Sequence, residues 1–403
     1  MLVRRMRRML VEIRGITIFL TAIACAATAQ EPDKTGSDTA NAHQELVEKL
    51  GHASFDVREF AAQRLQKIGL PARPALMNAL KSADLETRMG AHRVLVHIMQ
   101  DDFDTQLQDF VNGTQGADFH LPGWALFSRL VGDTAEARRL YAKMIRDEPE
   151  LLEKLDDLSG QAEPLRRLYE QRVQLLSNAS RVGRSHHLTI PCVATLLLIS
   201  QQPEVKSTRA ESRLYMFLVD PAIKREIMGG AHFSIVQKIL AKWVSSGNSQ
   251  HYALRIALAY ELEASGMQLA RGILEADTPN GTAVAYSAML VARFGNSADL
   301  RLLLPHLTNS TVFHSWHNAQ LKKEPIRIQV RDAVLAMAIR LTGQEPPDYG
   351  FKLLRSDEDT IYKVYTLGFL EDAERDAALQ KWQTWSKTHP DQVAPVGTNP
   401  VKN

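Results

Sequence analysis

The sequence SFDVREFAA at residues 54–62 is followed thirty residues later by a related sequence, DLETRMGA, at residues 84–91. The two copies share residue types at equal offsets, and the matching pairs are Asp56/Glu86, Arg58/Arg88, Ala61/Ala91 and Leu50/Leu80. Apolar residues around them recur with helical spacing, and glycine and proline separate the apolar runs. A repeat of this length that holds two helices indicates an α-solenoid, in which each repeat packs on the next.

These residues resemble the HEAT-repeat family in its short form, in which an acidic residue and an arginine open the second helix of each pair. Asp56-Val57-Arg58 and Glu86-Thr87-Arg88 fill those positions, and the resemblance covers residues 46–99. It implies an all-α fold, a right-handed α-solenoid. It also implies that the arginines join neighbouring repeats by binding acidic groups or carbonyls, and that they do not form a ligand site.

The same pattern returns near the end of the chain. The sequence IRIQVRDAV at residues 326–334 places Val330, Arg331 and Ala333 where the first repeat has Val57, Arg58 and Ala61. We therefore expect one long array of degenerate HEAT-like helical hairpins, and not two unrelated domains.

The middle of the chain carries a different helical signal. Ala137, Tyr141, Met144 and Pro149 have the offsets of the second helix of a tetratricopeptide (TPR) repeat. Met144 departs from the small residue of that pattern, and no first-helix signature precedes it. The middle segment is predicted to be helical, and the choice between TPR-like and HEAT-like repeats stays open.

Composition shifts and turn residues divide the chain further. The predicted segments are a signal peptide (1–29), a flexible linker (30–42), a HEAT-repeat segment (43–100), a middle helical segment that is TPR-like in part (101–245), a degenerate HEAT-like segment (246–345), a C-terminal helical cap (346–390) and a disordered tail (391–403).

The first 29 residues have the three parts of a secretory signal peptide. Arginines open the segment, an apolar run begins at Ile16, and Ala27-Thr28-Ala29 supplies the small-residue cleavage pattern. The apolar run is shorter than the ~20 residues that cross a bilayer as a helix, so cleavage is expected. The sequence predicts an exported bacterial protein, periplasmic or extracellular, and leaves the Sec and Tat routes open.

Removal of that segment changes the charge and the cysteine count. It carries five arginines and one glutamate, so the formal charge of +2 becomes −2, and no basic footprint for nucleic acid remains. Cys25 leaves as well, so Cys192 has no partner for an intramolecular disulfide. The most apolar remaining run, VATLLLI at 193–199, is too short to span a membrane.

Sequence motifs for catalysis are absent. The chain has no nucleophile elbow, P-loop, dinucleotide fingerprint, paired-cysteine motif or His-Glu-x-x-His. It has no His-Glu dipeptide either, which the iron-binding HEAT-repeat enzymes, the deoxyhypusine hydroxylases, require. His314 and His317 are weak metal candidates because two histidines at i, i+3 can share a helix face, and His186-His187 is a second cluster. We expect no catalytic residue, no metal and no cofactor.

The leading hypothesis is a non-enzymatic scaffold that binds a protein partner on the solenoid surface. One alternative is a HEAT-class enzyme or lyase-like protein that acts on a small molecule, because the repeats resemble those of phycobilin lyases in length. The other alternative is a structural envelope component that assembles with itself.

Overall fold

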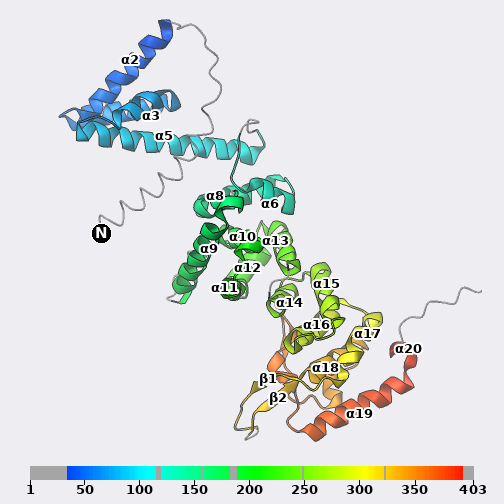
Figure 1. The fold of residues 1–403 in the computed structure, drawn as a ribbon. Helices are drawn as coiled ribbons and strands as arrows, with labels where there is room; N and C mark the ends of the chain where they lie inside the picture. Colours follow the sequence, from blue (N-terminus) through cyan, green and yellow to red (C-terminus); the bar gives the residue numbers. More distant parts are fainter. Residues whose placement is uncertain are drawn as a thin grey trace, which may run out of the picture. The chain divides into compact units, whose positions relative to one another are not determined.

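The structure is a computed structural model that describes residues 34–114, 119–156, 158–181, 188–246, 249–321 and 324–393. Most of these residues lie in helices, in agreement with the predicted helical class, and two short strand pairs accompany them (Figure 1). The chain divides into two compact units, residues 1–121 and 122–403. The predicted signal peptide, with Ala27 and Ala29, lies outside the described residues.

The first unit consists of helices joined by short turns. In chain order they are α2 (Lys34–Glu48), η1 (Lys49–Gly51), α3 (Phe55–Ile68), η2 (Leu70–Ala72), α4 (Arg73–Ala79) and α5 (Leu85–Asn112). Asp84 caps α5, and its carboxylate accepts hydrogen bonds from the Thr87 backbone N–H (2.7 Å) and hydroxyl (2.6 Å). These hydrogen bonds lower the pKa of Asp84. Ser54 precedes α3 at the equivalent position but makes no side-chain cap.

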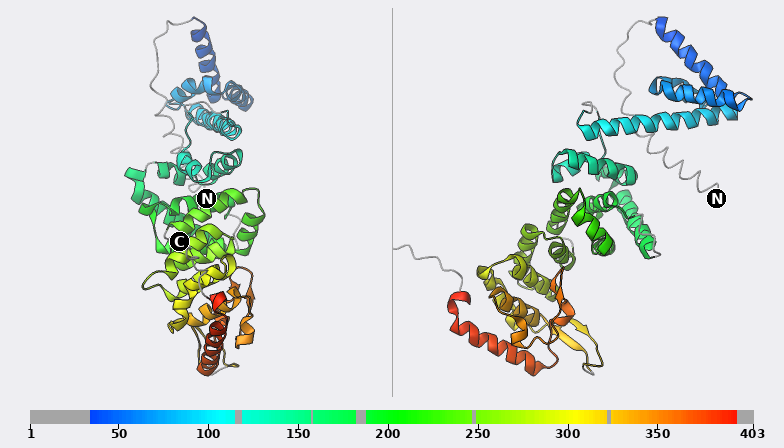
Figure 2. Two further views of the ribbon diagram at one scale, coloured as in Figure 1. Left: turned by 90° about the vertical axis from the view of Figure 1, so that its right-hand side faces the viewer. Right: turned by 180° about the vertical axis from the view of Figure 1, so that it is seen from behind.

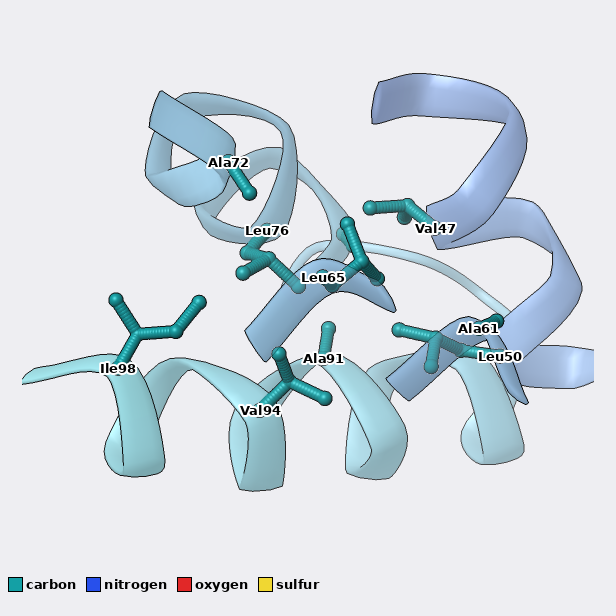
Figure 3. Packing of buried hydrophobic residues seen from close by; sticks show 10 residues of the cluster. Val47, Leu50, Ala61, Leu65, Ala72, Leu76, Ala91, Val94 and Ile98 are labelled. Atoms are coloured by element: carbon teal, nitrogen blue, oxygen red, sulfur yellow. The ribbon is translucent and has the colours of Figure 1, made fainter. Parts of the chain in front are cut away.

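One apolar core holds the first unit together (Figure 3). Its buried members come from all of these helices, and they are Val47, Leu50, Ala61, Leu65, Ala72, Leu76, Ala79, Ala91, Val94 and Ile98. Helices α3 and α5 contact each other, and the equivalent residues Ala61 and Ala91, which both have 0 % exposure, are small enough to allow close packing.

Helix α5 extends beyond the boundary that we predicted at residue 100. The acidic residues after Asp101 lie along one continuous helix to Asn112, where Gly113 ends it with a positive φ of 76°. The helix continues because Leu107 and Phe110 keep the apolar period and are buried, while most of the acidic side chains remain exposed.

Helix α2 begins at Lys34, inside the stretch 30–42 that we predicted to be a flexible linker. Burial in α2 starts only near Val47, and most of the side chains from Thr39 to Glu45 are exposed. Adding residues to an existing helix is far easier than starting a new one, so the packed end supports the exposed turns.

The second unit is larger. Its helical elements are α6 (Trp124–Val131), α7 (Ala135–Asp147), α8 (Pro149–Asp156), α9 (Leu158–Arg181), α10 (Ile190–Ser200), η4 (Pro203–Val205), α11 (Thr208–Leu218), α12 (Pro221–Gly229), α13 (Phe233–Ser245), α14 (Gln250–Ala259), α15 (Glu263–Leu274), α16 (Gly281–Phe294), η5 (Ser297–Asp299), α17 (Leu300–Leu303), η6 (Leu304–Thr308), α18 (Val330–Leu341), η7 (Pro346–Tyr349), η8 (Val364–Thr366), α19 (Asp372–Thr388) and α20 (Pro390–Val393). Its strands are β1 (Val312–Trp316), β2 (Ile326–Gln329), β3 (Ser356–Asp357) and β4 (Ile361–Tyr362).

Helices of the second unit pack mainly on helices that are close to them along the chain. One row runs from α7 through α10 and α13 to α15, and a second runs from α9 through α11, α14 and α16 to α18. The views in Figure 2 show these helices succeeding one another in chain order, from green through yellow. The rows also contact each other, for example α10 with α11 and α15 with α16, so the apolar faces are covered in pairs.

The strand pair β1–β2 is an element that the sequence analysis did not predict. Ile326 and Ile328 are buried, whereas Arg327 is exposed, which is the period of a strand. The two strands are antiparallel, with His314 opposite Ile328 and Trp316 opposite Ile326. The helix begins only at Val330, where a capping box between Gln329 and Asp332 starts α18.

The C-terminal helix α19 packs on α18 through Ala378 and Trp382, both buried. Short helix α20 covers the start of the predicted tail, and residues 394–403 lie outside the described residues. Among the described helices, none combines the length and the apolar character that a membrane span needs.

Candidate functional site

The repeated arginines of the first unit make matching contacts. The Nη1 atom of Arg58 donates hydrogen bonds to the carbonyl oxygens six and five residues before it, at 2.7 and 3.0 Å. Arg88 makes the same pair, at 2.6 and 3.4 Å. Both arginines therefore bind the loop before their own helix, and only the 3.9 Å contact of Arg58 with Glu86 reaches the next repeat. Their guanidinium groups serve local architecture.

Arg331 does not repeat this arrangement. Its Nε donates to the side-chain oxygen of Gln329 at 2.6 Å, and the strand before α18 leaves no loop carbonyls at the equivalent place. The next residue, Asp332, is buried and accepts a hydrogen bond from Nε of Arg375 at 2.7 Å. This pair, with exposed fractions of 0 % and 3 %, joins α18 to α19.

The remaining residues of the repeat pattern occupy packing or surface positions. Val330 and Ala333 are fully buried, as are Ala61 and Ala91, and Val57 is half-buried. Asp56 and Glu86 are exposed in the first turns of α3 and α5, where a negative charge favours the helix dipole.

The weak metal candidates are not on a helix. His314 lies in strand β1 and His317 follows its end, and both side chains are exposed. The i, i+3 argument required a helix, because in an extended chain residues three apart point to opposite faces. Among the described residues, no group of three His, Cys, Asp or Glu side chains has metal-binding geometry, and His186-His187 lies outside them.

A cluster of aromatic and basic side chains gathers on three consecutive helices of one row. We call it the tyrosine–arginine cluster: Tyr215 from α11, Tyr252 and Arg255 from α14, and Tyr286 from α16. The rings of Tyr215 and Tyr252 are stacked, with centroids 4.5 Å apart and planes 19° apart. The guanidinium carbon of Arg255 lies 5.0 Å from the Tyr215 ring centroid and 5.5 Å from that of Tyr286. Arg255 is thus held against two aromatic faces.

Helices α11 and α14 are fixed to each other at both ends of the cluster. At one end, the buried carboxylate of Glu211 accepts hydrogen bonds from the backbone N–H and the hydroxyl of Ser249. At the other end, the Tyr260 hydroxyl donates to the carbonyl of Leu218 at 2.7 Å. The cluster therefore rests on a rigid pair of helices, which suits a binding site.

Arg255 makes no hydrogen bond and no ion pair with any other described residue, and its side chain is partly exposed. Other arginines of this unit meet a carboxylate directly: Arg172 with Glu148 at 2.6 Å, and Arg271 with Asp299 at 3.1 Å. The planar fork of donors on Arg255 is thus oriented by aromatic stacking but has no protein acceptor within the described residues.

Burial and the charge of Arg255 shift the neighbouring pKa values. Burial raises the pKa of Tyr215 to about 12, and Arg255 opposes this rise. Burial also raises the pKa of Tyr286 against the same opposition. The pKa of His251, whose ring adjoins Tyr252, is lowered by burial first and by Arg255 second. Burial therefore favours the neutral forms of the Tyr215, Tyr286 and His251 side chains.

The strand pair β3–β4 and its turn carry Asp357, Glu358 and Asp359, and we call this segment the acidic hairpin. It borders the cluster. Lys224 of α12 pairs with Asp359, and Arg293 of α16 donates to the carbonyls of Glu358 and Asp359 at 3.1 and 3.3 Å. Asp357 and Asp359 are near enough to raise the pKa values of Tyr286 and Tyr215, respectively.

The two non-glycine residues with positive φ among the described residues adjoin these contacts. They are Ile361 (69°), within the hairpin, and Glu261 (55°), whose carboxylate pairs with Arg293. Such backbone strain recurs at functional sites.

The arrangement favours binding over catalysis. The cluster offers donors and ring faces, but none of its described members is a nucleophile hydrogen-bonded to a base. A groove of about 630 Å³ elsewhere in the unit is lined by Glu275, Asp277, Arg301 and His306, where charges of both signs mix. The ring of His306 is hydrogen-bonded to the Leu274 carbonyl at 2.9 Å.

Our sequence reasoning missed this cluster. A signal was present, since Tyr215, Tyr252 and Tyr286 recur at intervals of 37 and 34 residues, close to the length of a helical repeat.

No protein-family model matches the chain, and neither a curated protein nor a solved structure does.

Proposed function

We propose that this chain is an exported, non-enzymatic scaffold of the bacterial envelope, an α-solenoid of degenerate HEAT-like hairpins that binds a protein partner. The observation that carries the proposal is the tyrosine–arginine cluster, with its side chains on α11, α14 and α16 of one row. Tyr215 and Tyr286 are buried, whereas Tyr252 and Arg255 are half-buried, so an extended partner that lies along these stacked helices would meet the last two. Tyrosine and arginine are also the residue types enriched at binding hot spots.

The packing of neighbours on neighbours supports the solenoid part of the proposal. Each helix of the two rows meets helices close to it in the chain, as expected when repeats are added one after another. The matching contacts of Arg58 and Arg88 support repetition within the first unit.

Affinity capture tests the proposal. The full chain is expressed in a bacterium with its N-terminal segment intact, and an envelope fraction is applied to the purified protein. We expect a discrete protein to be retained by the native chain and to be lost with Arg255→Glu. Arg340→Glu is the matched control, because Arg340 is exposed on α18 of the same unit. Retention of a small molecule without any protein, or equal retention by all three chains, would contradict the proposal.

A further inference from the structure

We propose that Arg255 is a carboxylate-binding residue, and that the partner engages the tyrosine–arginine cluster with an acidic side chain or a C-terminal carboxylate of an extended segment. This inference rests on the proposed function, and it adds the chemistry of the contact. It begins from the guanidinium of Arg255, which stacks on Tyr215 and Tyr286 and has no acceptor among the described residues.

The stacked position prepares Arg255 for a planar anion. Two ring faces restrict the guanidinium, so less conformational freedom is lost when its N–H groups bind an acceptor. A carboxylate matches the fork of donors with two parallel hydrogen bonds. Partial burial strengthens this contact relative to one in open water.

The charge of the surroundings favours a monoanion over a phosphate group. A phosphate carries close to two negative charges at neutral pH and is usually held by several cations. Here Lys224 pairs with Asp359 of the acidic hairpin, Arg293 pairs with Glu261 and donates to two hairpin carbonyls, and Asp357 lies on the Tyr286 side. Among the described residues of the cluster, Arg255 is the one cation without an acceptor, and a single cation beside acidic residues fits a monoanion better than a phosphate.

A second unsatisfied group lies on the same ring that Arg255 covers. The Tyr215 hydroxyl is buried and has no hydrogen-bond partner among the described residues. A buried hydroxyl without a partner is costly, and a ligand oxygen within reach would satisfy it. The exposed side chain of Met216, one residue further on, supplies apolar surface for the rest of a bound segment.

A display library of random twelve-residue peptides, selected on the full chain, tests the inference. Enriched peptides are synthesised in three forms: unchanged, with each Asp or Glu replaced by its amide, and with an amidated C-terminus. Affinities are measured by fluorescence anisotropy for the native chain, Arg255→Lys, Tyr215→Phe and the control Arg340→Lys.

We expect one of the two neutralised peptide forms to lose affinity roughly tenfold or more, as loss of a charge-assisted hydrogen bond does. Arg255→Lys should show a similar loss, because lysine cannot bind bidentately, and Tyr215→Phe a smaller one. Arg340→Lys should bind like the native chain. Thermal unfolding of each variant checks that it is folded, and the neutralised peptides test the same contact on the unaltered protein.

The inference is overturned if neutral peptides bind as well as acidic ones, or if a folded Arg255→Lys variant binds like the native chain. Peptides that lose affinity with Tyr215→Phe but not when their acidic groups are neutralised would refute the carboxylate and leave the proposed function standing. Failure to enrich any peptide would count against both.

Discussion

At the scale of single residues, arginines that are buried or half-buried in the second unit have two kinds of surroundings. Arg172 and Arg375 each meet a carboxylate within 2.7 Å, so their charges are neutralised where water is scarce. Arg255 instead lies between tyrosine rings, with its donors free of other described residues. A cation kept unpaired beside aromatic faces is a feature of recognition surfaces more than of cores, and it is the residue on which the proposed function depends.

Tyr215 provides a test of the cluster's burial. Its pKa is raised to about 12, above the ordinary value near 10. Between these two pH values the unfolded chain loses the phenol proton while the folded chain keeps it, so the free energy of unfolding must fall as pH rises. We expect Tyr215→Phe to reduce this alkaline loss of stability. Urea unfolding at pH values from roughly 9 to 12, a range that includes both pKa values, measures the free energy of unfolding of the two chains. An unchanged slope would contradict the burial of this ring.

Cys192 is expected to be chemically inert in the folded chain. Burial raises the pKa of its thiol, and the carboxylate of Glu148 raises it further. The thiolate is the reactive form, so alkylation at neutral pH should be very slow. Mass spectrometry of the peptide that contains Cys192, after iodoacetamide treatment with and without denaturant, measures this. Rapid labelling of the folded chain would show that the thiol is accessible.

At the scale of elements, a buried ion pair joins the C-terminal helix α19 to α18. Asp332 and Arg375 are nearly fully buried and join α18 to α19, and Arg375 also donates to the carbonyl of Arg327 at 3.1 Å. The C-terminal helix therefore depends on a charge pair as well as on Ala378 and Trp382.

Removal of one partner of this pair should be strongly destabilising. Arg375→Ala leaves the carboxylate of Asp332 buried without its cation, and we expect a loss of about 3–5 kcal/mol in the free energy of unfolding. The matched control is Lys352→Ala, which removes the ion pair between the exposed Lys352 and Glu374 of α19. This change should lower the free energy of unfolding by less than about 1 kcal/mol. Chemical denaturation of both variants measures these changes in the free energy of unfolding. Equal losses in Arg375→Ala and Lys352→Ala would show that the buried pair does not stabilise the packing of α19.

The repeated arginines give a second prediction at this scale. Arg58→Ala and Arg88→Ala each remove two hydrogen bonds to loop carbonyls, and we expect each to lower the free energy of unfolding by about 1 kcal/mol. Arg93→Ala, on the exposed face of α5, should change it by no more than about 0.5 kcal/mol. Markedly different effects of the first two variants would mean that the two copies are not equivalent.

Sequence reasoning succeeds where spacing along the chain and spacing in the fold coincide. The pairs Ala61/Ala91 and Arg58/Arg88 recur at thirty residues and take matching environments, so the helical character of this part could be predicted. The strand before α18 was not predicted, because the alternation of Ile326 and Ile328 with polar residues spans only four positions and directly precedes a helical pattern. Helix α5 was ended too early because its acidic face looks irregular as a sequence, although Leu107 and Phe110 keep the apolar period.

At the scale of the whole molecule, the described helices belong to two units, and the second is built from helices that pack on near neighbours in the chain. Such packing brings together side chains of neighbouring helices that lie far from each other in the sequence. The contact between Tyr215, Arg255 and Tyr286 arises in this way, and a single sequence did not reveal it because it depends on how α11, α14 and α16 stack.

Photocrosslinking from the cluster surface tests the proposed function most directly. Met216 is 60 % exposed and lies one helical turn after Ser212, whose hydroxyl meets that of Tyr252 at 3.2 Å. A photoreactive amino acid at position 216 of the full chain should crosslink to a discrete envelope protein in cells. The same group at Leu175, which is 61 % exposed on α9, should not. Equal crosslinking from both positions, or none from position 216, would contradict a partner-binding surface at the tyrosine–arginine cluster.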